Sequence, residues 1–151
     1  MKEKGDNLTS ERLSKLSVPA MITAILNKSG VVSLPRAIRI VQDALVVKCE
    51  PTDLDAEHIY TLLAERSCWV IPESQSFIAS SQVVYQSSKR KQELRDSIIL
   101  SLIRDREIDV QKLMRDANCD FRLLGPIIDT VAREQTGTPR YRIKTYDSDF
   151  D

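Results

Sequence analysis

The chain has 151 residues and a mass of 17.2 kDa, and its 22 Lys and Arg residues balance 22 Asp and Glu residues. With 42% hydrophobic residues and no net charge, the sequence excludes a chain that stays disordered for want of a core. No apolar run approaches the roughly 20 residues that a membrane-spanning helix needs, so we expect no membrane association. The polar N-terminus lacks the apolar core of a secretory signal, and we expect a protein of the nucleus or cytosol.

The first half of the chain begins with a charged segment, residues 1–15, which we expect to be a flexible arm. Apolar residues then recur every three or four positions between Ser17, which can cap a helix, and Gly30, which can end it. A short β-prone piece, Val31-Val32, leads to a second helix whose N-cap is Ser33.

Residues 46–51 are expected to be extended because they precede a proline. Thr52 then begins a third predicted helix. Strand-like residues at 68–71 and 77–79, separated by a polar turn, predict a β-hairpin, with residues 83–85 as a further extended piece. This order of helix, strand, helix, helix and hairpin is that of a winged helix-turn-helix module.

The second half of the chain repeats this order. A helix is predicted from about Lys89 to Arg104, followed by a short extended link, a helix capped by Asp109 and another capped by Asp120. Gly125-Pro126 predicts a break in that last helix, which is expected to continue to Thr136. Residues 140–145 alternate in polarity and predict a terminal strand.

Two copies of one order predict an α+β, mostly helical protein of tandem winged helix-turn-helix domains. We expect the domains at residues 16–86 and 87–146, after the arm at 1–15 and before an acidic tail at 147–151. An irregular all-helical domain with two incidental hairpins is the alternative.

The sequence carries no set of residues that predicts catalysis, and we expect no enzyme, cofactor, metal or small-molecule ligand. His58 is the only histidine and is expected to be a partly buried polar residue of the third helix. Cys49, Cys68 and Cys119 are odd in number and widely spaced, which indicates reduced packing residues.

The helices that would enter a DNA groove carry acidic exposed positions, which disfavours sequence reading by either helix. Basic residues gather at the start of the Lys89 helix and along the last strand, where they form either a solvated face or a phosphate contact. Trp69 opens the hairpin, and we favour a lid on the core over an exposed anchor for a partner. The candidate contacts for a partner or for phosphate are Trp69, Lys89, Arg90, Lys91, Arg95, Arg140, Arg142 and Lys144.

Several short motifs resemble a known family. They are Trp69-Val70-Ile71, Tyr85 at a strand end, Arg95-Asp96, Tyr141-Arg142-Ile143, and the segment from Tyr146 to Phe150. From about Leu16 to Phe150 the chain is similar to the first tandem winged-helix unit in the C-terminal half of the RNA polymerase III subunit RPC5 family, also called the Sin-like family.

The resemblance implies a nuclear, non-catalytic subunit of the polymerase that makes small RNAs such as transfer RNA. Its winged helices would be docking units for other protein subunits of a transcription complex. Family members also carry an upstream dimerisation barrel, which nothing in this sequence can form. Either the chain is a fragment of a longer protein, or it is similar only through its winged helices, and the barrel's pairing is not carried over.

Two functions follow. The first is a protein-interaction scaffold within RNA polymerase III, with weak nucleic-acid contact at most. The alternative is a winged-helix DNA-binding transcription factor that contacts phosphate through its wings and the basic residues at 89–95.

Overall fold

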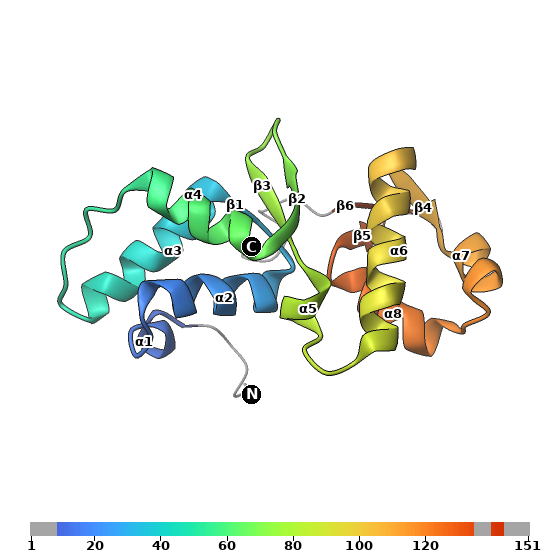
Figure 1. Cartoon of the computed structure of the whole chain (residues 1–151), viewed down its shortest axis with the longest axis horizontal. Coiled ribbons are helices and arrows are strands. Elements are labelled where there is room, and N and C mark those ends of the chain that lie inside the picture. Colours follow the sequence, from blue (N-terminus) through green and yellow to red (C-terminus); the bar gives the residue numbers. More distant parts are fainter. Residues whose placement is uncertain (1–8, 135–139, 144–151) are drawn as a thin grey trace. The chain divides into compact units, whose positions relative to one another are not determined.

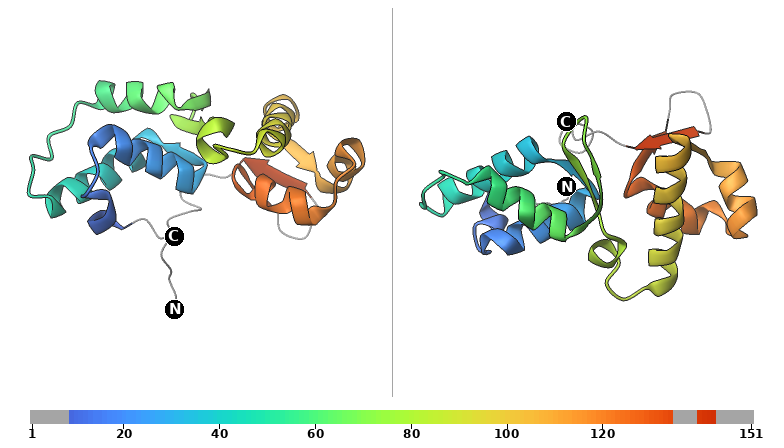
Figure 2. Two further views of the ribbon diagram at one scale, coloured as in Figure 1. Left: turned by 60° about the horizontal axis from the view of Figure 1, so that its bottom comes forward. Right: turned by 45° about the horizontal axis from the view of Figure 1, so that its top comes forward.

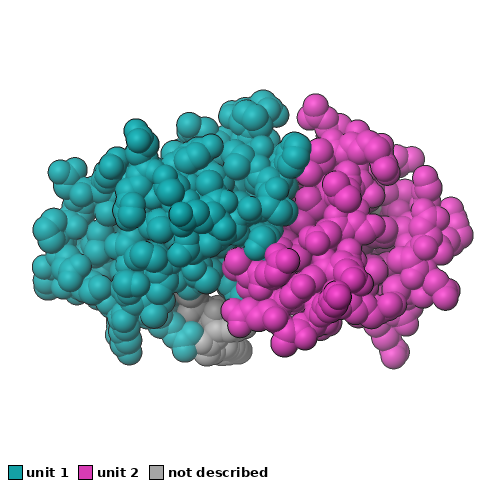
Figure 3. Space-filling view, viewed as in Figure 1, with its two compact units in different colours: residues 1–80 teal, residues 81–151 magenta. Residues whose placement is uncertain are grey.

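The computed structural model describes residues 9–134 and 140–143. The protein is an α+β structure in which helices predominate over two small antiparallel sheets (Figure 1). The chain folds as two compact units, residues 1–80 (unit 1) and residues 81–151 (unit 2), which Figure 3 colours separately. Among the described helices, none has the length and apolar character needed to cross a bilayer.

Unit 1 contains four helices and three strands in its described part. They are α1 (Ser10–Leu13), α2 (Val18–Ser29), β1 (Val31–Ser33), α3 (Leu34–Val47), α4 (Ala56–Glu65), β2 (Ser67–Ile71) and β3 (Ser76–Ala79). The predicted N-caps are confirmed, because Ser17 Oγ accepts the Ala20 N–H and Ser33 Oγ accepts the Arg36 N–H. Gly30 ends α2 at a φ of 75°, a conformation that favours glycine and lets β1 begin at once.

The sheet of unit 1 has the order β1-β3-β2, so the last strand of the unit lies in the middle. Helices α2, α3 and α4 gather on one side of this sheet (Figure 2, right view). Phe77 of β3 is fully buried, and the Tyr60 ring of α4 meets it edge-on with 5.1 Å between centroids. The core is apolar and comprises Met21, Ile22, Ile25, Leu26, Val41, Leu45, Ile59, Leu63 and Phe77.

Three expectations for unit 1 are wrong in part. The predicted flexible arm contains α1, which packs Leu13 into the core at 1% exposure and contacts α3, while residues 1–8 lie outside the described part. Helix α3 runs to Val47, into the segment expected to be extended. Helix α4 begins at Ala56 with Asp55 as its N-cap, not at Thr52, because Gln42 of α3 binds the Thr52 carbonyl and holds that residue in the preceding loop.

Unit 2 repeats the order of elements after a short extra helix. Its elements are α5 (Ser81–Val84), α6 (Lys89–Asp105), β4 (Glu107–Asp109), α7 (Val110–Ala117), α8 (Phe121–Asp129), β5 (Ala132–Glu134) and β6 (Arg140–Ile143). The predicted caps Asp109 and Asp120 are confirmed. The sheet order β4-β6-β5 again places the last strand in the middle. The core is formed mainly by Ile98, Leu102, Leu124, Ile127, Ile128 and Val131.

The structure also corrects the expectations for unit 2. Residues 81–84 are helical because they pack on α6, so the extended piece expected at 83–85 is wrong. Helix α8 continues through Pro126 without the expected break. It ends at Asp129, and the unpredicted strand β5 follows because it pairs with β6. Thr145 and the acidic tail at 147–151 lie outside the described residues.

Replacing Phe77 by Ala tests the packing of the middle strand in unit 1. We expect the free energy of unfolding to fall by about 3–5 kcal/mol, the usual cost of removing a buried aromatic ring. Urea unfolding followed by the emission of the single tryptophan, which lies on β2, reports on this unit. A loss below about 1 kcal/mol would contradict the burial of this ring.

Candidate interaction surface

Trp69 lies on β2 with 46% of its surface exposed, so the predicted core position is wrong. It pairs with Ile78 of β3, whereas its neighbour Val70 pairs with Phe77, the residue that meets Tyr60 of the helix layer. Because successive side chains of a strand point to opposite faces, Trp69 points away from the face that contacts Tyr60. The residue is therefore available as an anchor for a partner.

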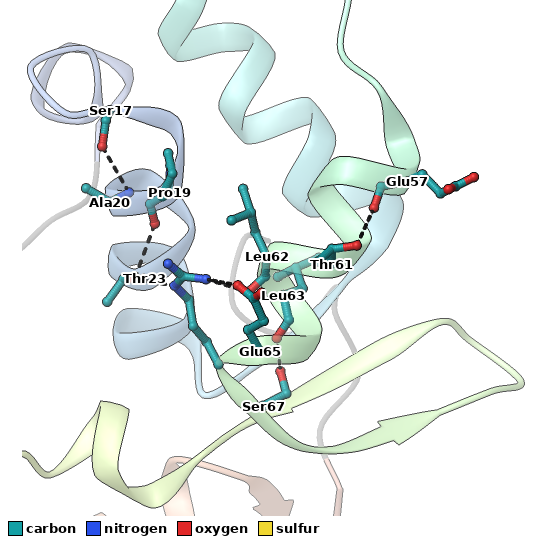
Figure 4. Close-up of polar contacts among 11 residues, drawn as sticks. Ser17, Pro19, Ala20, Thr23, Glu57, Thr61, Leu62, Leu63, Glu65 and Ser67 are labelled. Atoms are coloured by element: carbon teal, nitrogen blue, oxygen red, sulfur yellow. Dashed lines mark hydrogen bonds and ion pairs between the residues drawn. The ribbon is translucent and has the colours of Figure 1, made fainter.

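Arg66 positions the start of β2 against the helices. Its Nε donates to Thr23 Oγ1 of α2 at 2.7 Å, and its Nη1 donates to the Leu62 carbonyl of α4 at 2.9 Å. Figure 4 shows Thr23 facing the end of α4, where Ser67 Oγ also donates to the Leu63 carbonyl at 2.6 Å. These hydrogen bonds connect α2, the end of α4 and the beginning of the strand that carries Trp69.

The start of α4 presents an acidic surface. Asp53, Asp55 and Glu57 are exposed, and Asp55 Oδ1 also accepts the Glu57 N–H as the helix N-cap. Acidic groups stabilise this end of a helix through its dipole, but they repel phosphate. His58 is exposed, which corrects its predicted partial burial beside the apolar stripe; the neighbouring Ile59 is the buried residue.

The basic side chains at the start of α6 are exposed but differ in their contacts. Lys89, Arg90 and Lys91 are exposed, and the Lys91 ammonium lies 5.6 Å from the centroid of the Tyr85 ring. Arg90 Nη2 lies 3.1 Å from Cys119 Sγ, a contact that draws this side chain toward the loop between α7 and α8. Three side chains of the predicted basic cluster thus reach the surface of unit 2.

Arg95, the fourth predicted member, is fully buried and is not a surface contact. Its Nε donates to Thr130 Oγ1 at 2.8 Å and its Nη1 donates to Ser81 Oγ at 3.1 Å. Ser81 Oγ in turn donates to Asp96 Oδ1 at 2.6 Å. The helical spacing of Arg95 places it on the same side of α6 as Ile98 and Ile99, so it joins α5, α6 and the end of α8.

The phenol of Tyr85 lies next to this buried network. Burial raises the pKa of Tyr85, and the positive charge of Arg95 acts in the opposite direction. The Tyr85 carbonyl accepts a hydrogen bond from Gln92 Nε2, which holds the loop between α5 and α6. The arrangement is therefore structural in character and connects α5 with α6.

The basic stripe predicted on the last strand is balanced by acidic neighbours. Arg140 and Arg142 are exposed as expected, and both form ion pairs with Glu107 of β4, at 2.8 Å and 3.5 Å. Arg133 of β5 pairs in the same way with Asp129 at 2.9 Å. Lys144 lies outside the described residues. These pairs reduce the positive potential that the strand offers to a phosphate backbone.

The residues that could hold a metal do not come together. Across residues 9–134 and 140–143, no group of three His, Cys, Asp or Glu side chains is arranged to bind an ion. Cys49 and Cys68 are exposed, which corrects their predicted role as packing residues, and Cys119 is intermediate. A pocket of about 90 Å³ between α6, β4 and α7 is smaller than the 300–1,000 Å³ typical of ligand sites.

Comparison with known proteins identifies a family for this chain. The family model described as RPC5 protein matches residues 1–151 of the chain. The comparison with curated proteins found no match.

Replacing Arg95 by Ala tests whether this residue acts inside unit 2. We expect the free energy of unfolding to fall by about 2–5 kcal/mol, because a large buried side chain and its hydrogen bonds are lost. Unfolding in urea, followed by circular dichroism, measures the change. The matched control Arg90→Ala removes an exposed arginine from the same helix and is expected to change stability by no more than about 0.5 kcal/mol. Equal effects of both variants would contradict a structural role for Arg95.

Replacing Glu107 by Ala tests how far ion pairing neutralises the last strand. We expect stability to change by less than about 1 kcal/mol, since these pairs are exposed. Binding to heparin, a polyanion, is expected to become tighter and more dependent on salt, because two guanidinium groups lose their carboxylate. Retention on a heparin column measures this, and unchanged elution would show that Glu107 does not control the charge of the strand.

Proposed function

This chain belongs to the RPC5 family, and we propose that it forms a protein-docking region of RNA polymerase III built from two winged helix-turn-helix domains. The family comprises non-catalytic subunits of this polymerase, so other protein subunits are its partners and a nuclear location is implied. The docking role, the winged-helix fold and the contact residues are the finer parts of the proposal.

The order of elements supports two winged helices. In each unit a helix leads into a short strand, two further helices follow, and a hairpin returns beside the first strand. In this arrangement α4 and α8 occupy the positions of the recognition helices, and the hairpins β2–β3 and β5–β6 are the wings. The domain limits at 16–86 and 87–146 stay a prediction.

The single observation that carries the docking role is the acidic start of α4. A helix that reads the major groove offers Arg, Lys, Asn or Gln near its N-terminus. Here that end exposes Asp53, Asp55 and Glu57, and residues 50–65 contain no Lys or Arg to balance them. A protein partner suits such a surface better than a phosphate backbone.

We assign the contacts with neighbouring subunits to the exposed candidates. They are Trp69 on the first wing, Lys89, Arg90 and Lys91 at the start of α6, and Arg140 and Arg142 on the second wing. Lys144 remains a candidate from the sequence alone. Arg95 is no longer a candidate because it is buried.

The alternative function, phosphate binding through the wings and the basic start of α6, is not favoured. The two wing arginines pair with Glu107, and Arg90 contacts Cys119. These contacts leave a local positive surface of modest strength, which is typical of weak and non-specific nucleic-acid contact.

Fluorescence anisotropy with a labelled duplex of mixed sequence separates the two functions. We expect no saturable binding at near-physiological salt for duplex concentrations up to roughly 10⁻⁴ M, the weak limit of non-specific binding. Micromolar binding that weakens steeply with salt would favour the alternative. The Lys89→Ala, Arg90→Ala and Lys91→Ala triple variant would then lose that binding.

Co-purification tests the docking role directly. A tagged form of the chain is expected to recover RNA polymerase III subunits from nuclear extract, and Trp69→Ala is expected to recover less. The matched control is Phe121→Ala, because Phe121 is 47% exposed in unit 2 while Trp69 is 46% exposed in unit 1. Recovery of no polymerase subunit by the unchanged chain would reject the docking role.

A further inference from the structure

Strand β2 is an edge of the sheet in unit 1. Within the described part of the chain it pairs with β3 and with no other strand. A bulge interrupts the pairing between Ser67 and Trp69, and from Trp69 to Ile71 the register with β3 is regular. The outer side of an edge strand presents backbone N–H and C=O groups that a further strand can pair with.

The two units differ at this edge although their topology is the same. Trp69 on β2 stands opposite Ile78, as Arg133 on β5 stands opposite Arg142. The described part of β5 is Ala132–Glu134, in which two residues are charged, and Arg133 forms an ion pair with Asp129. Charged side chains are a usual means by which proteins prevent pairing at an edge.

Strand β2 lacks charged side chains. All five of its residues, Ser67–Ile71, are uncharged, and Trp69 is exposed. An uncharged edge of this length readily pairs with another chain. The comparison between the units therefore indicates that β2 is open to a strand where β5 is protected.

The surroundings of β2 determine the charge of the segment that fits. Residues 49–88, which include α4 and the wing, contain six acidic residues and one basic residue, Arg66. Arg66 itself pairs with Glu65, whose side chain is 62% exposed. Glu73 in the hairpin turn is also exposed. Glu65 stands two residues before β2 and Glu73 two residues after it, so an extended segment with basic ends meets complementary charge at both ends of the strand.

We propose that the outer edge of β2, along Trp69 to Ile71, accepts an extended segment of a partner protein, uncharged and β-prone at its centre and flanked by Lys or Arg. This inference rests on the proposed docking function and names the chemistry of the partner. The backbone of the segment pairs with β2, Trp69 packs against its central side chains, and Glu65 at the end of α4 and Glu73 in the turn attract its ends.

Designed peptides test the proposal with the full chain. The probe is fluorescein-labelled Lys-Lys-Thr-Val-Thr-Val-Thr-Lys-Lys, titrated by fluorescence anisotropy. One control has Glu in place of every Lys, and the second has Pro at both Val positions and cannot form a strand. We expect the probe to bind at least about ten times more tightly than either control. In parallel, unlabelled probe is expected to shift the Trp69 emission to shorter wavelength as the indole leaves water.

Two variants locate the binding. Trp69→Ala is expected to weaken probe binding about tenfold, while Phe121→Ala, an equally exposed aromatic residue of unit 2, leaves it unchanged. Amide hydrogen exchange distinguishes strand pairing from adhesion to the Trp69 side chain alone. Strand pairing is expected to protect backbone amides within residues 67–71 from exchange, whereas side-chain adhesion would not. Circular dichroism checks that both variants are folded.

Several outcomes would overturn the proposal. Equal binding of the probe and the proline peptide would show side-chain adhesion without strand pairing. Binding that survives Trp69→Ala, or absence of binding by the probe, would remove β2 as the site. A shift of Trp69 emission with protein concentration alone would assign the edge to a second copy of the chain. The docking function would stand in each case, because DNA binding and co-purification test it separately.

Discussion

The position of the last strand in each unit is the constraint on which the rest of the fold depends. Strand β3 lies between β1 and β2, so the first strand of the unit has the last strand as its partner in the described sheet. Every residue of β3 is buried, and Phe77 connects it to α4 through Tyr60. The middle strand therefore joins the two ends of the unit around one core, and its pairing with β1 joins residues that are distant in sequence.

The same strand order positions the residues of the β2–β3 hairpin. Because the hairpin leaves α4 through Arg66, which binds both Thr23 and the Leu62 carbonyl, the start of β2 is held at the helix layer. Trp69 follows three positions later on the outer strand. Unit 2 uses the same order of elements but has Arg133 at the corresponding strand position, with Asp129 as its partner. One topology thus carries an uncharged edge in one unit and a charged edge in the other.

Charge explains why neither the start of α4 nor strand β6 resembles a DNA-binding surface. The acidic start of α4 repels phosphate, and the basic strand β6 shares its charge with Glu107. An overall charge of zero conceals this local separation. Local charge of both signs is what the proposed docking to neighbouring proteins requires, since such charge gives specificity for a protein partner without a general attraction to nucleic acid.

Local features of the fold follow from the amino-acid sequence. The caps Ser17, Ser33, Asp109 and Asp120 and the terminating Gly30 are short-range signals, because a side chain or a backbone conformation acts within a few residues. Helical spacing likewise predicted α2 and α6, and motif similarity identified the family. The strand-like run of residues on either side of a polar turn predicted β2 and β3, since β-prone residues and turn residues are also local signals.

Burial of individual side chains, and the existence of strands that depend on pairing, required the tertiary structure. Arg95 is buried against the hydroxyls of Ser81 and Thr130, which lie in distant elements, and no local pattern marks such a partner. Trp69 is exposed because the strand phase turns Val70 toward the helix layer. Strand β5 exists because β6 pairs with it. In each case the physical cause is a contact between residues far apart in the sequence, which composition and periodicity do not contain.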